Sequence, residues 1–459
     1  MVVHIQKILE KTSEKINPSK KEQEEEKQFS EKIIQKIKKL NPKIDVVLAG
    51  SVSRQTHVKG DRDIDVFVLF DESVSKEEFK KEGLRIGKQI LKGHEWEKAY
   101  SQHPYIRGKI EGFEIEIVPG YKIKENSLIK SAVDRTPLHT KYIIGKLNEK
   151  QKDEVRLLRQ FLKGINCYGA ELKSNSMPGY LVELLILNYG SFEKTIKAVS
   201  EWKEGEIIDL EGRIEGEIKK KKFDNPLIVI DPVDENRNVA SALSHNQFAR
   251  FIAASRAFMK NPSEKFFFEH KRKLMNEKKA KEILNKKELI ALKISYPKEL
   301  ADIVWGQLNK FEKRIHSALI EADFIVNRTA SWTDEKKEII VLMELESLIL
   351  QKSRKLIGPM VWDKHNGEKF IEAHKKLISG PRIEKGKWII ETERKYIKAE
   401  KFVLDYIKKL KKQTSSSITR GTNKGMKVMN EKDLIKLFKQ NKAFARFFSD
   451  YLIGKEVFL

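Results

Sequence analysis

The stretch that decides the fold is GSVSRQTHVKGDRDIDVFVLF, residues 50–70. It opens with Gly50 and Ser51 after one apolar run and closes with Asp63 and Asp65 at the start of another. Alternate residues of a strand share a face, so the two aspartates lie side by side. Neighbouring carboxylates repel unless a cation lies between them, and Mg²⁺ suits such ligands. A Gly-Ser turn entering a helix leaves N–H groups for a phosphate. The stretch indicates phosphoryl or nucleotidyl transfer.

A third carboxylate is expected from a neighbouring strand. Residues 113–118 read FEIEIV, the alternation of a half-buried strand, with Glu114 and Glu116 on one face. Taken alone, the pattern is typical of an ordinary exposed strand face. Beside Asp63 and Asp65, we interpret Glu116 as the third metal ligand.

Composition limits the class of protein. The 459 residues are enough for several domains. The chain has 91 Lys and Arg against 67 Asp and Glu, a net charge of +24, which favours a polyanionic partner, most often nucleic acid. A charged surface that binds nothing is the alternative. The single cysteine, Cys167, excludes an intramolecular disulfide and any zinc site built on several cysteines. No run reaches membrane-spanning length and no signal peptide is seen, so we expect a cytoplasmic protein without a membrane partner.

Hydrophobic periodicity predicts an α+β domain first. Residues 3–40 are predicted to be helical with a break at Pro18, and a helix at 75–92 is capped by Ser75 with Glu78 three residues on. Strands are predicted at 100–106 and 109–118, and such a mixture of strands and helices makes an α+β domain.

From residue 131 the pattern becomes helical, and a second α/β module follows. Residues 135–140 are predicted to form a loop entering a helix. The further predicted elements are helices at 153–165, 180–189, 266–287, 305–323 and 431–452, strands at 289–295 and 339–345, and a flexible basic loop at 408–427.

The stretch at residues 50–70 resembles the catalytic signature of the DNA polymerase β-like nucleotidyltransferase superfamily. Four later segments narrow the resemblance to archaeal, class I CCA-adding enzymes, the tRNA nucleotidyltransferases: RTPLHT, FLKGINCYGAELK, SMPGYLVELLILNYGSF and DPVDENRNVASALS. IVWGQL, SWTDEKKEIIVLMELE and GPMVW resemble the tail of that family. The likeness runs in order through almost the whole chain.

The resemblance implies an organisation and an activity. It implies a polymerase β-like catalytic head at 1–130, a helical neck that recognises the nucleotide at 131–262, and an α/β body and tail that bind tRNA at 263–459. The enzyme would add CCA to tRNA 3′ ends from CTP and ATP without a template, in tRNA maturation and repair. A homodimer is left open.

The same resemblance assigns residues. Asp63, Asp65 and Glu116 would hold two Mg²⁺ ions, although family members usually have aspartate in place of Glu116. The nucleotide site would comprise Gly50, Ser51, Arg54, His139, Arg159, Lys163, Tyr168 and Arg237. Ser51 and Arg54 match triphosphate contacts, and Arg159 stands where the family has lysine, with Lys163 as a nearby substitute. Arg237 matches the arginine that reads the incoming base.

Other readings of these features are open. One is a related nucleotidyltransferase with another acceptor, such as a poly(A) polymerase or an antibiotic-modifying enzyme; the tail-like segments and basic charge argue against a small-molecule acceptor. Another, suggested by Glu116, is a catalytically inactive RNA-binding protein. The intact acidic pair and Gly50-Ser51 argue against it.

Overall fold

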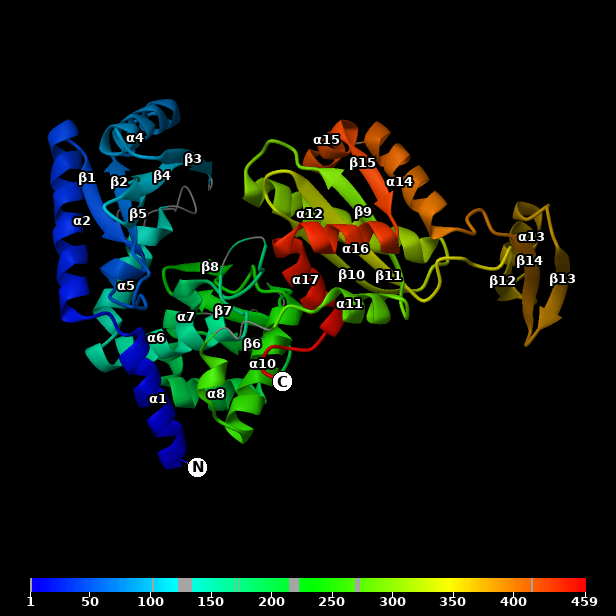
Figure 1. Ribbon diagram of the computed structural model, residues 1–459, viewed down its shortest axis with the longest axis horizontal. Coiled ribbons are helices and arrows are strands. Elements are labelled where there is room, and N and C mark those ends of the chain that lie inside the picture. Colours follow the sequence, from blue (N-terminus) through cyan, green and yellow to red (C-terminus); the bar gives the residue numbers. More distant parts are fainter. Residues whose placement is uncertain are drawn as a thin grey trace. The chain divides into compact units, whose positions relative to one another are not determined.

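The computed structural model describes residues 2–100, 103–122, 134–169, 171, 173–213, 223–268, 273–413 and 416–459. The chain forms two compact units (Figure 1). The first comprises residues 1–271 together with 456–459, and the second comprises residues 272–455.

The first unit contains a five-stranded sheet that follows its first two helices. Its order is β1-β2-β5-β4-β3, with β2 and β5 parallel and the other pairs antiparallel. The strands are β1 (Asp45–Ala49), β2 (Asp63–Phe70), β3 (Trp96–Tyr100), β4 (Pro104–Ile110) and β5 (Phe113–Tyr121). Helices α2 (Lys20–Leu40) and α4 (Lys76–Ile90) pack on one face over buried side chains such as Phe29 and Phe79 (Figure 1). The other face carries a smaller apolar cluster that includes Phe67, Leu69 and Val118.

Local sequence explains the boundaries of these elements. Pro18 separates α1 (Val2–Ile16) from α2, as predicted. Ser75 caps α4 by accepting the Glu78 N–H, also as predicted. The predicted strand at 109–118 is wrong in one respect, because Glu111 and Gly112 have φ of 52° and 84°. Positive φ at two successive residues makes a tight hairpin turn between β4 and β5.

A mainly helical region follows in the same unit. Its elements are α5 (Arg135–Lys146), α6 (Glu149–Gly164), α7 (Gly179–Tyr189), α8 (Phe192–Glu201), α10 (His245–Lys260), η1 (Glu264–Phe266) and a sheet of β6 (Glu206–Ile208), β7 (Leu227–Asp231) and β8 (Asp234–Asn238). The sequence did not predict this sheet. It also placed 135–140 in a loop, whereas α5 is helical from Arg135.

The second unit confirms the predicted α/β module. Its sheet has the order β10-β11-β9-β15, built from β9 (Glu288–Ser295), β10 (Val326–Thr333), β11 (Glu338–Leu345) and β15 (Met426–Met429). One face packs on α12 (Ala301–Glu321) and α14 (Ala399–Gln413), and the other on α11 (Glu277–Leu284), α16 (Glu431–Gln440) and α17 (Lys442–Ile453). A second sheet, unpredicted, has the order β12-β14-β13 from β12 (Ser353–Met360), β13 (Ser379–Glu384) and β14 (Lys387–Glu393), beside α13 (Lys364–Ala373).

Three predictions for this part of the chain are wrong. The expected loop at 408–427 contains the end of α14, all of α15 (Ser417–Lys424) and the start of β15; Ser415 lies outside the described residues. Here Gly421 lets α15 approach β9, because an added Cβ would lie 2.4 Å from a β9 carbonyl oxygen. The described part of 266–287 holds α11 instead of one long helix. Asn441 divides the last predicted helix, since its side chain caps the start of α17.

Within the described part of the chain, none of the helices has both the length and the apolar character required to cross a membrane.

Candidate active site

Strand register gathers the predicted carboxylates on one sheet face. Asp65 of β2 lies opposite Glu116 of β5, and Asp63 lies opposite Glu114. On the other side of β5, Arg107 of β4 lies opposite Glu116. Paired residues of adjacent strands share a face. The face turned away from α2 and α4 therefore carries a row of acidic and basic side chains.

Gly50 brings the turn after β1 directly against this row. It has φ of +72°, and a Cβ built on it would lie 1.7 Å from Oδ2 of Asp65. Only glycine adopts this backbone without strain and leaves room for the carboxylate. Ser51 follows in the one-turn helix α3 (Gly50–Ser53). The structure thus places the Gly-Ser turn next to Asp65, as the sequence predicts.

Burial makes these carboxylates hard to ionise. Burial raises the pKa of Asp65 to about 6, with nearby Arg54 opposing the rise. Burial, and then repulsion from Asp65, raises the pKa of Glu116 to about 7, and the pKa of Asp63 is also raised, chiefly by burial. Oxygen ligands with mutual repulsion fit a hard divalent cation. Among the side chains that the structure describes, no three His, Cys, Asp or Glu are grouped closely enough to hold a metal ion as they stand. The three-ligand assignment stays a prediction.

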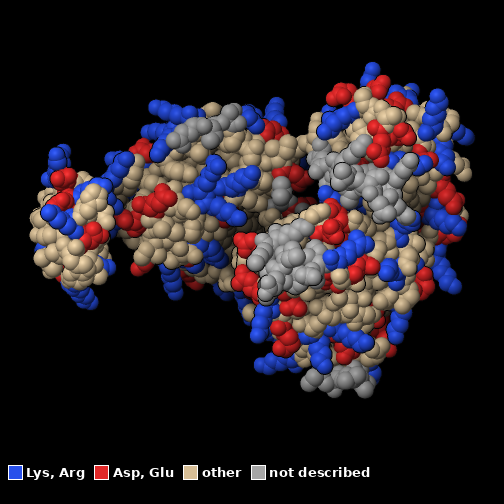
Figure 2. Space-filling model, turned by 180° about the vertical axis from the view of Figure 1, so that it is seen from behind, with Lys and Arg blue, Asp and Glu red and all other residues tan. Residues whose placement is uncertain are grey.

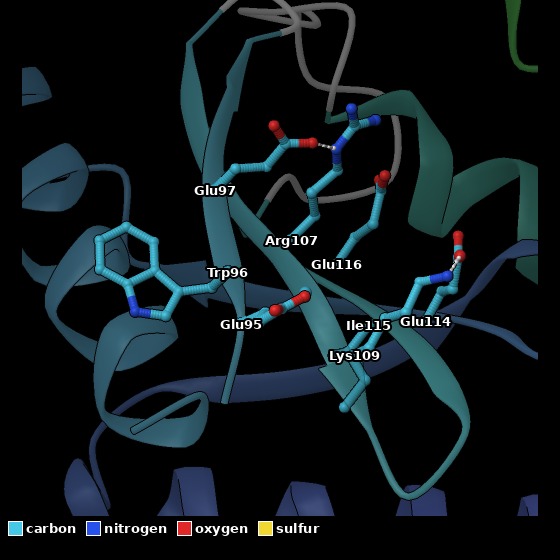
Figure 3. Close-up of a pocket in the computed structure, with 9 residues that line it drawn as sticks. Glu95, Trp96, Glu97, Arg107, Lys109, Glu114, Ile115 and Glu116 are labelled. Atoms are coloured by element: carbon cyan, nitrogen blue, oxygen red, sulfur yellow. Dashed lines mark hydrogen bonds and ion pairs between the residues drawn. The ribbon is translucent and has the colours of Figure 1, made fainter. Parts of the chain in front are cut away.

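A cavity of about 480 Å³ lies beside Glu116 over β3, β4 and β5 (Figure 3). Arg107 donates to Glu97 at 2.6 Å inside it, and Figure 3 shows the guanidinium between Glu97 and Glu116. The Tyr105 hydroxyl donates to Glu116 at 3.3 Å. Strand β4 therefore supplies both a cation and a hydrogen-bond donor to the acidic face.

Arg54 is buried. Its Nε donates to Glu183 at 2.8 Å and its Nη1 donates to Thr140 at 3.2 Å. The same Glu183 oxygen accepts from Thr56 at 2.5 Å and lies 3.9 Å from Nη2 of Arg159. The Glu183 side chain is fully buried in α7. One carboxylate is thus hydrogen-bonded to Arg54 and forms a longer ion pair with Arg159.

Two basic residues of α6 frame an aromatic ring. Arg159 and Lys163, one turn apart, each place their charge 5.5 Å from the centroid of the Tyr168 ring. Lys163 also forms an ion pair with Asp61 at 2.7 Å, just before β2. The structure therefore brings Arg159, Lys163 and Tyr168 together and joins them to Arg54 through Glu183.

A third group forms around Asp231, the last residue of β7. Its Oδ2 accepts from Nε2 of His139 at 2.9 Å and from Nη1 of Arg237 at 2.7 Å. The Tyr180 ring stacks on His139 at 3.9 Å between centroids. His139 is buried in α5 instead of lying in the loop predicted for residues 135–140, and Arg237 lies on β8.

The pKa values in this group follow from burial and hydrogen bonding. Burial lowers the pKa of His139 and favours its neutral form, against the pull of Asp231. Burial alone would raise the pKa of Asp231, but the hydrogen bonds from His139 and Arg237 hold that pKa below its usual value.

Sequence reasoning missed Glu183, Tyr180 and Asp231. Glu183 is the only charged residue of the apolar helix GYLVELLILNY, and a lone charge in such a helix requires a buried partner. Asp231 closes the apolar strand LIVID and carried a similar signal.

Comparison with known proteins defines the class first. Residues 30–139 match the family described as nucleotidyltransferase domain, residues 153–268 match the second domain of tRNA nucleotidyltransferase, and residues 285–431 match the C-terminal domain of CCA-adding enzyme. The first unit is therefore a nucleotidyltransferase with an α+β fold.

Curated relatives then give the family. The CCA-adding enzyme of Methanocaldococcus jannaschii is 40% identical over 415 residues, covering 86% of this chain and 89% of the relative. That of Archaeoglobus fulgidus is 35% identical over 441 residues, covering 95% of this chain and 96% of the relative. The chain belongs to the family of CCA-adding enzymes, and it is an enzyme of the nucleotidyltransferase class. A solved structure of a cytoplasmic RNA terminal U-transferase is also similar, at 16% identity and a TM-score of 0.47, covering 58% of this chain and 99% of that one.

Proposed function

We propose that this enzyme adds cytidine, cytidine and adenosine to tRNA 3′ ends from CTP and ATP, without a nucleic-acid template and with release of pyrophosphate. The observation that carries the proposal is the carboxylate row of Asp65 and Glu116 with the Gly50 turn against it. Two groups of basic and aromatic side chains lie in the same unit, as a nucleotide pocket requires. The names of the curated relatives support tRNA as the acceptor.

The group of side chains around Glu183, which we call the Arg54 group, suits the triphosphate. It comprises Arg54, Thr56, Thr140 and Arg159. Arg54 and Arg159 are buried cations beside the same carboxylate, and hydrogen bonds to Glu183 and Thr140 orient Arg54 before a ligand arrives. Donors fixed in advance stabilise developing negative charge without reorganisation. Lys163 and Ser51 add a further cation and a hydroxyl group to the proposed phosphate contacts.

The Asp231 group suits the base. One Nη of Arg237 is bound to Asp231, and its side chain remains 29% exposed, so further guanidinium donors can face a ligand. An arginine fork donates to acceptors that cytosine and adenine share, whereas uracil and guanine present N–H groups there. Arg237 is therefore proposed to select CTP and ATP.

The carboxylates would hold divalent cations, with Mg²⁺ as the ion that suits oxygen ligands. Asp63, Asp65 and Glu116 are the proposed ligands, and two ions are expected from the family resemblance. Bound cations would lower the pKa of the RNA 3′-hydroxyl and neutralise the pyrophosphate. The chain's own part is to keep Asp65 against the Gly50 turn and Glu116 beside Tyr105 and Arg107.

The excess of Lys and Arg over Asp and Glu supports a polyanionic acceptor. Figure 2 shows Lys and Arg side chains spread over one face of both units, with acidic side chains between them. We assign tRNA binding to contacts with backbone phosphates, chiefly through the second unit, which contains the match to the C-terminal domain.

The test uses tRNA that ends before CCA, Mg²⁺ and each labelled nucleotide in turn. Incorporation of CTP and then ATP is expected, and Asp65→Ala should abolish it. Asp45→Ala is the matched control, because Asp45 lies on β1 of the same sheet and forms an exposed ion pair with Lys122. Tailing with ATP alone would indicate a poly(A) polymerase instead. Binding without incorporation would indicate an inactive RNA-binding relative.

A further inference from the structure

We propose that Asp231 is a positioning residue of the nucleotide pocket, which fixes His139 as a hydrogen-bond acceptor toward the nucleotide and holds Arg237 in its base-selecting orientation. The inference rests on the proposed role of Arg237 in base selection. It assigns to His139 an N–H or O–H group of the ligand, such as a ribose hydroxyl or a base amino group, and not a phosphate.

Asp231 acts through its neighbours because it cannot reach a ligand. Its side chain has no exposed surface. Oδ2 accepts from both His139 and Arg237, while Oδ1 accepts from the Val233 N–H at 3.1 Å and lies 3.4 Å from the Tyr180 hydroxyl. The backbone bond to Val233 locks the carboxylate in a short turn after β7. A carboxylate held this way fixes the positions of the His139 and Arg237 side chains that donate to it.

The contact with Asp231 determines which nitrogen of His139 carries the proton. An ionised carboxylate only accepts hydrogen bonds, so Nε2 of His139 must be the donor. Burial and the nearby cations Arg237 and Arg54 disfavour a second proton on the ring. Nδ1 therefore keeps its lone pair. Among the described residues Nδ1 has no hydrogen-bond partner, and it is left for a ligand that donates.

Stacking fixes the plane in which that lone pair lies. The rings of Tyr180 and His139 are inclined by 23° with centroids 3.9 Å apart, and the Tyr180 hydroxyl reaches back to Asp231. His139 is thus held at its edge by a carboxylate and on its face by a tyrosine. Neutral imidazole offers an acceptor and no charge, which suits a hydroxyl or amino group better than a phosphate.

Asp231→Asn is the diagnostic change, because it preserves shape and replaces one acceptor with an NH₂ group. The amide keeps a single oxygen. If that oxygen takes the place of Oδ1, the NH₂ group faces the two donors His139 Nε2 and Arg237 Nη1; if it takes the place of Oδ2, the NH₂ group faces the Val233 N–H and the turn that holds the side chain is broken. Asp234→Asn is the matched control on the adjacent strand, where Asp234 pairs with Arg135 at 3.0 Å.

The first measurement is ¹⁵N NMR of enzyme labelled in histidine, with the His139 signals assigned from a His139→Gln variant. We expect the neutral Nε2–H tautomer at about pH 7.5 in the unmodified enzyme and in Asp234→Asn, and altered signals in Asp231→Asn. A charged ring or an Nδ1–H tautomer in the unmodified enzyme would overturn the proposal, and this result does not depend on the folding of any Asp231 variant.

The second measurement is the preference for CTP over UTP with tRNA ending before CCA. It is expressed as kcat/KM for CTP divided by kcat/KM for UTP. Asp231→Asn should lower that ratio roughly tenfold, in the direction of Arg237→Ala, and Asp234→Asn should not. An unchanged ratio in Asp231→Asn together with a reduced ratio in Arg237→Ala would refute the positioning role and leave base selection by Arg237 intact. An unchanged ratio in both variants would instead refute the base-selecting role itself.

Discussion

Glu183→Leu should destabilise the first unit severely. The substitution removes the shared counter-ion of Arg54 and Arg159, whose side chains are only 7% and 4% exposed. Leaving a buried charge without its partner costs about 3–5 kcal/mol. The Thr56 hydroxyl also loses its acceptor, an effect that overlaps with the first. We expect a total loss of about 3–5 kcal/mol, a large share of the roughly 5–15 kcal/mol that stabilises a typical domain.

The assay is urea unfolding followed by circular dichroism, with the transition of the first unit compared between variants. Glu204→Leu is the control, because Glu204 forms an exposed pair with His245 and should change stability by no more than about 1 kcal/mol. Adding Arg54→Met to Glu183→Leu should restore part of the loss, since one uncompensated charge then disappears. If Glu183→Leu costs no more than the control, the two guanidinium groups do not depend on Glu183 and the reasoning fails.

Three further predictions follow from other parts of the molecule. Gly50→Ala should lower kcat roughly 100-fold, because the new methyl group must displace Asp65, whereas Gly60→Ala, also at positive φ but with open space around it, should keep its kcat. Burial lowers the pKa of His139, so the stability this residue confers is complete above its unfolded pKa of about 6.5 and declines as pH falls below that value. Between about pH 7.5 and 5.5 the free energy of unfolding should therefore fall more in the unmodified enzyme than in His139→Gln. Equal slopes of the unfolding free energy against pH in the two proteins would contradict this. Affinity for tRNA lacking CCA should fall steeply between about 50 and 200 mM salt and be similar for two unrelated tRNAs, and a flat response would refute binding through phosphates.

The local sequence pattern correctly predicted the sheet face that carries the carboxylates. The alternation around Asp63 and Glu116 gave the shared face, because strand periodicity is encoded residue by residue. The environment of Arg54 could not be predicted that way, since its partner Glu183 lies 129 residues further along the chain. His139 and Asp231 are likewise 92 residues apart. Whether an arginine or a histidine is exposed or buried depends on such distant packing, which periodicity does not report.

The prediction of secondary structure failed where tertiary contacts outweighed the local composition. The Ser/Thr/Gly-rich segment at 408–427 looks like a loop, yet α15 forms there with a capping box made by Ser416 and Thr419 and packs closely on β9 through Gly421. The short strands β6, β7 and β8 carry too few residues for a periodic signal, and pairing with one another is what defines them.

The return of residues 456–459 to the first unit has a consequence for biosynthesis. Glu456 accepts from Arg250 at 2.8 Å, and the Phe458 ring stacks on Phe266 at 6.2 Å between centroids. Domains generally fold in the order in which the ribosome delivers them. Here the first unit leaves the ribosome before the residues that complete its core, and it must wait until the whole second unit has been translated. During that interval the side of the Phe266 ring that Phe458 covers in the finished chain lacks this cover.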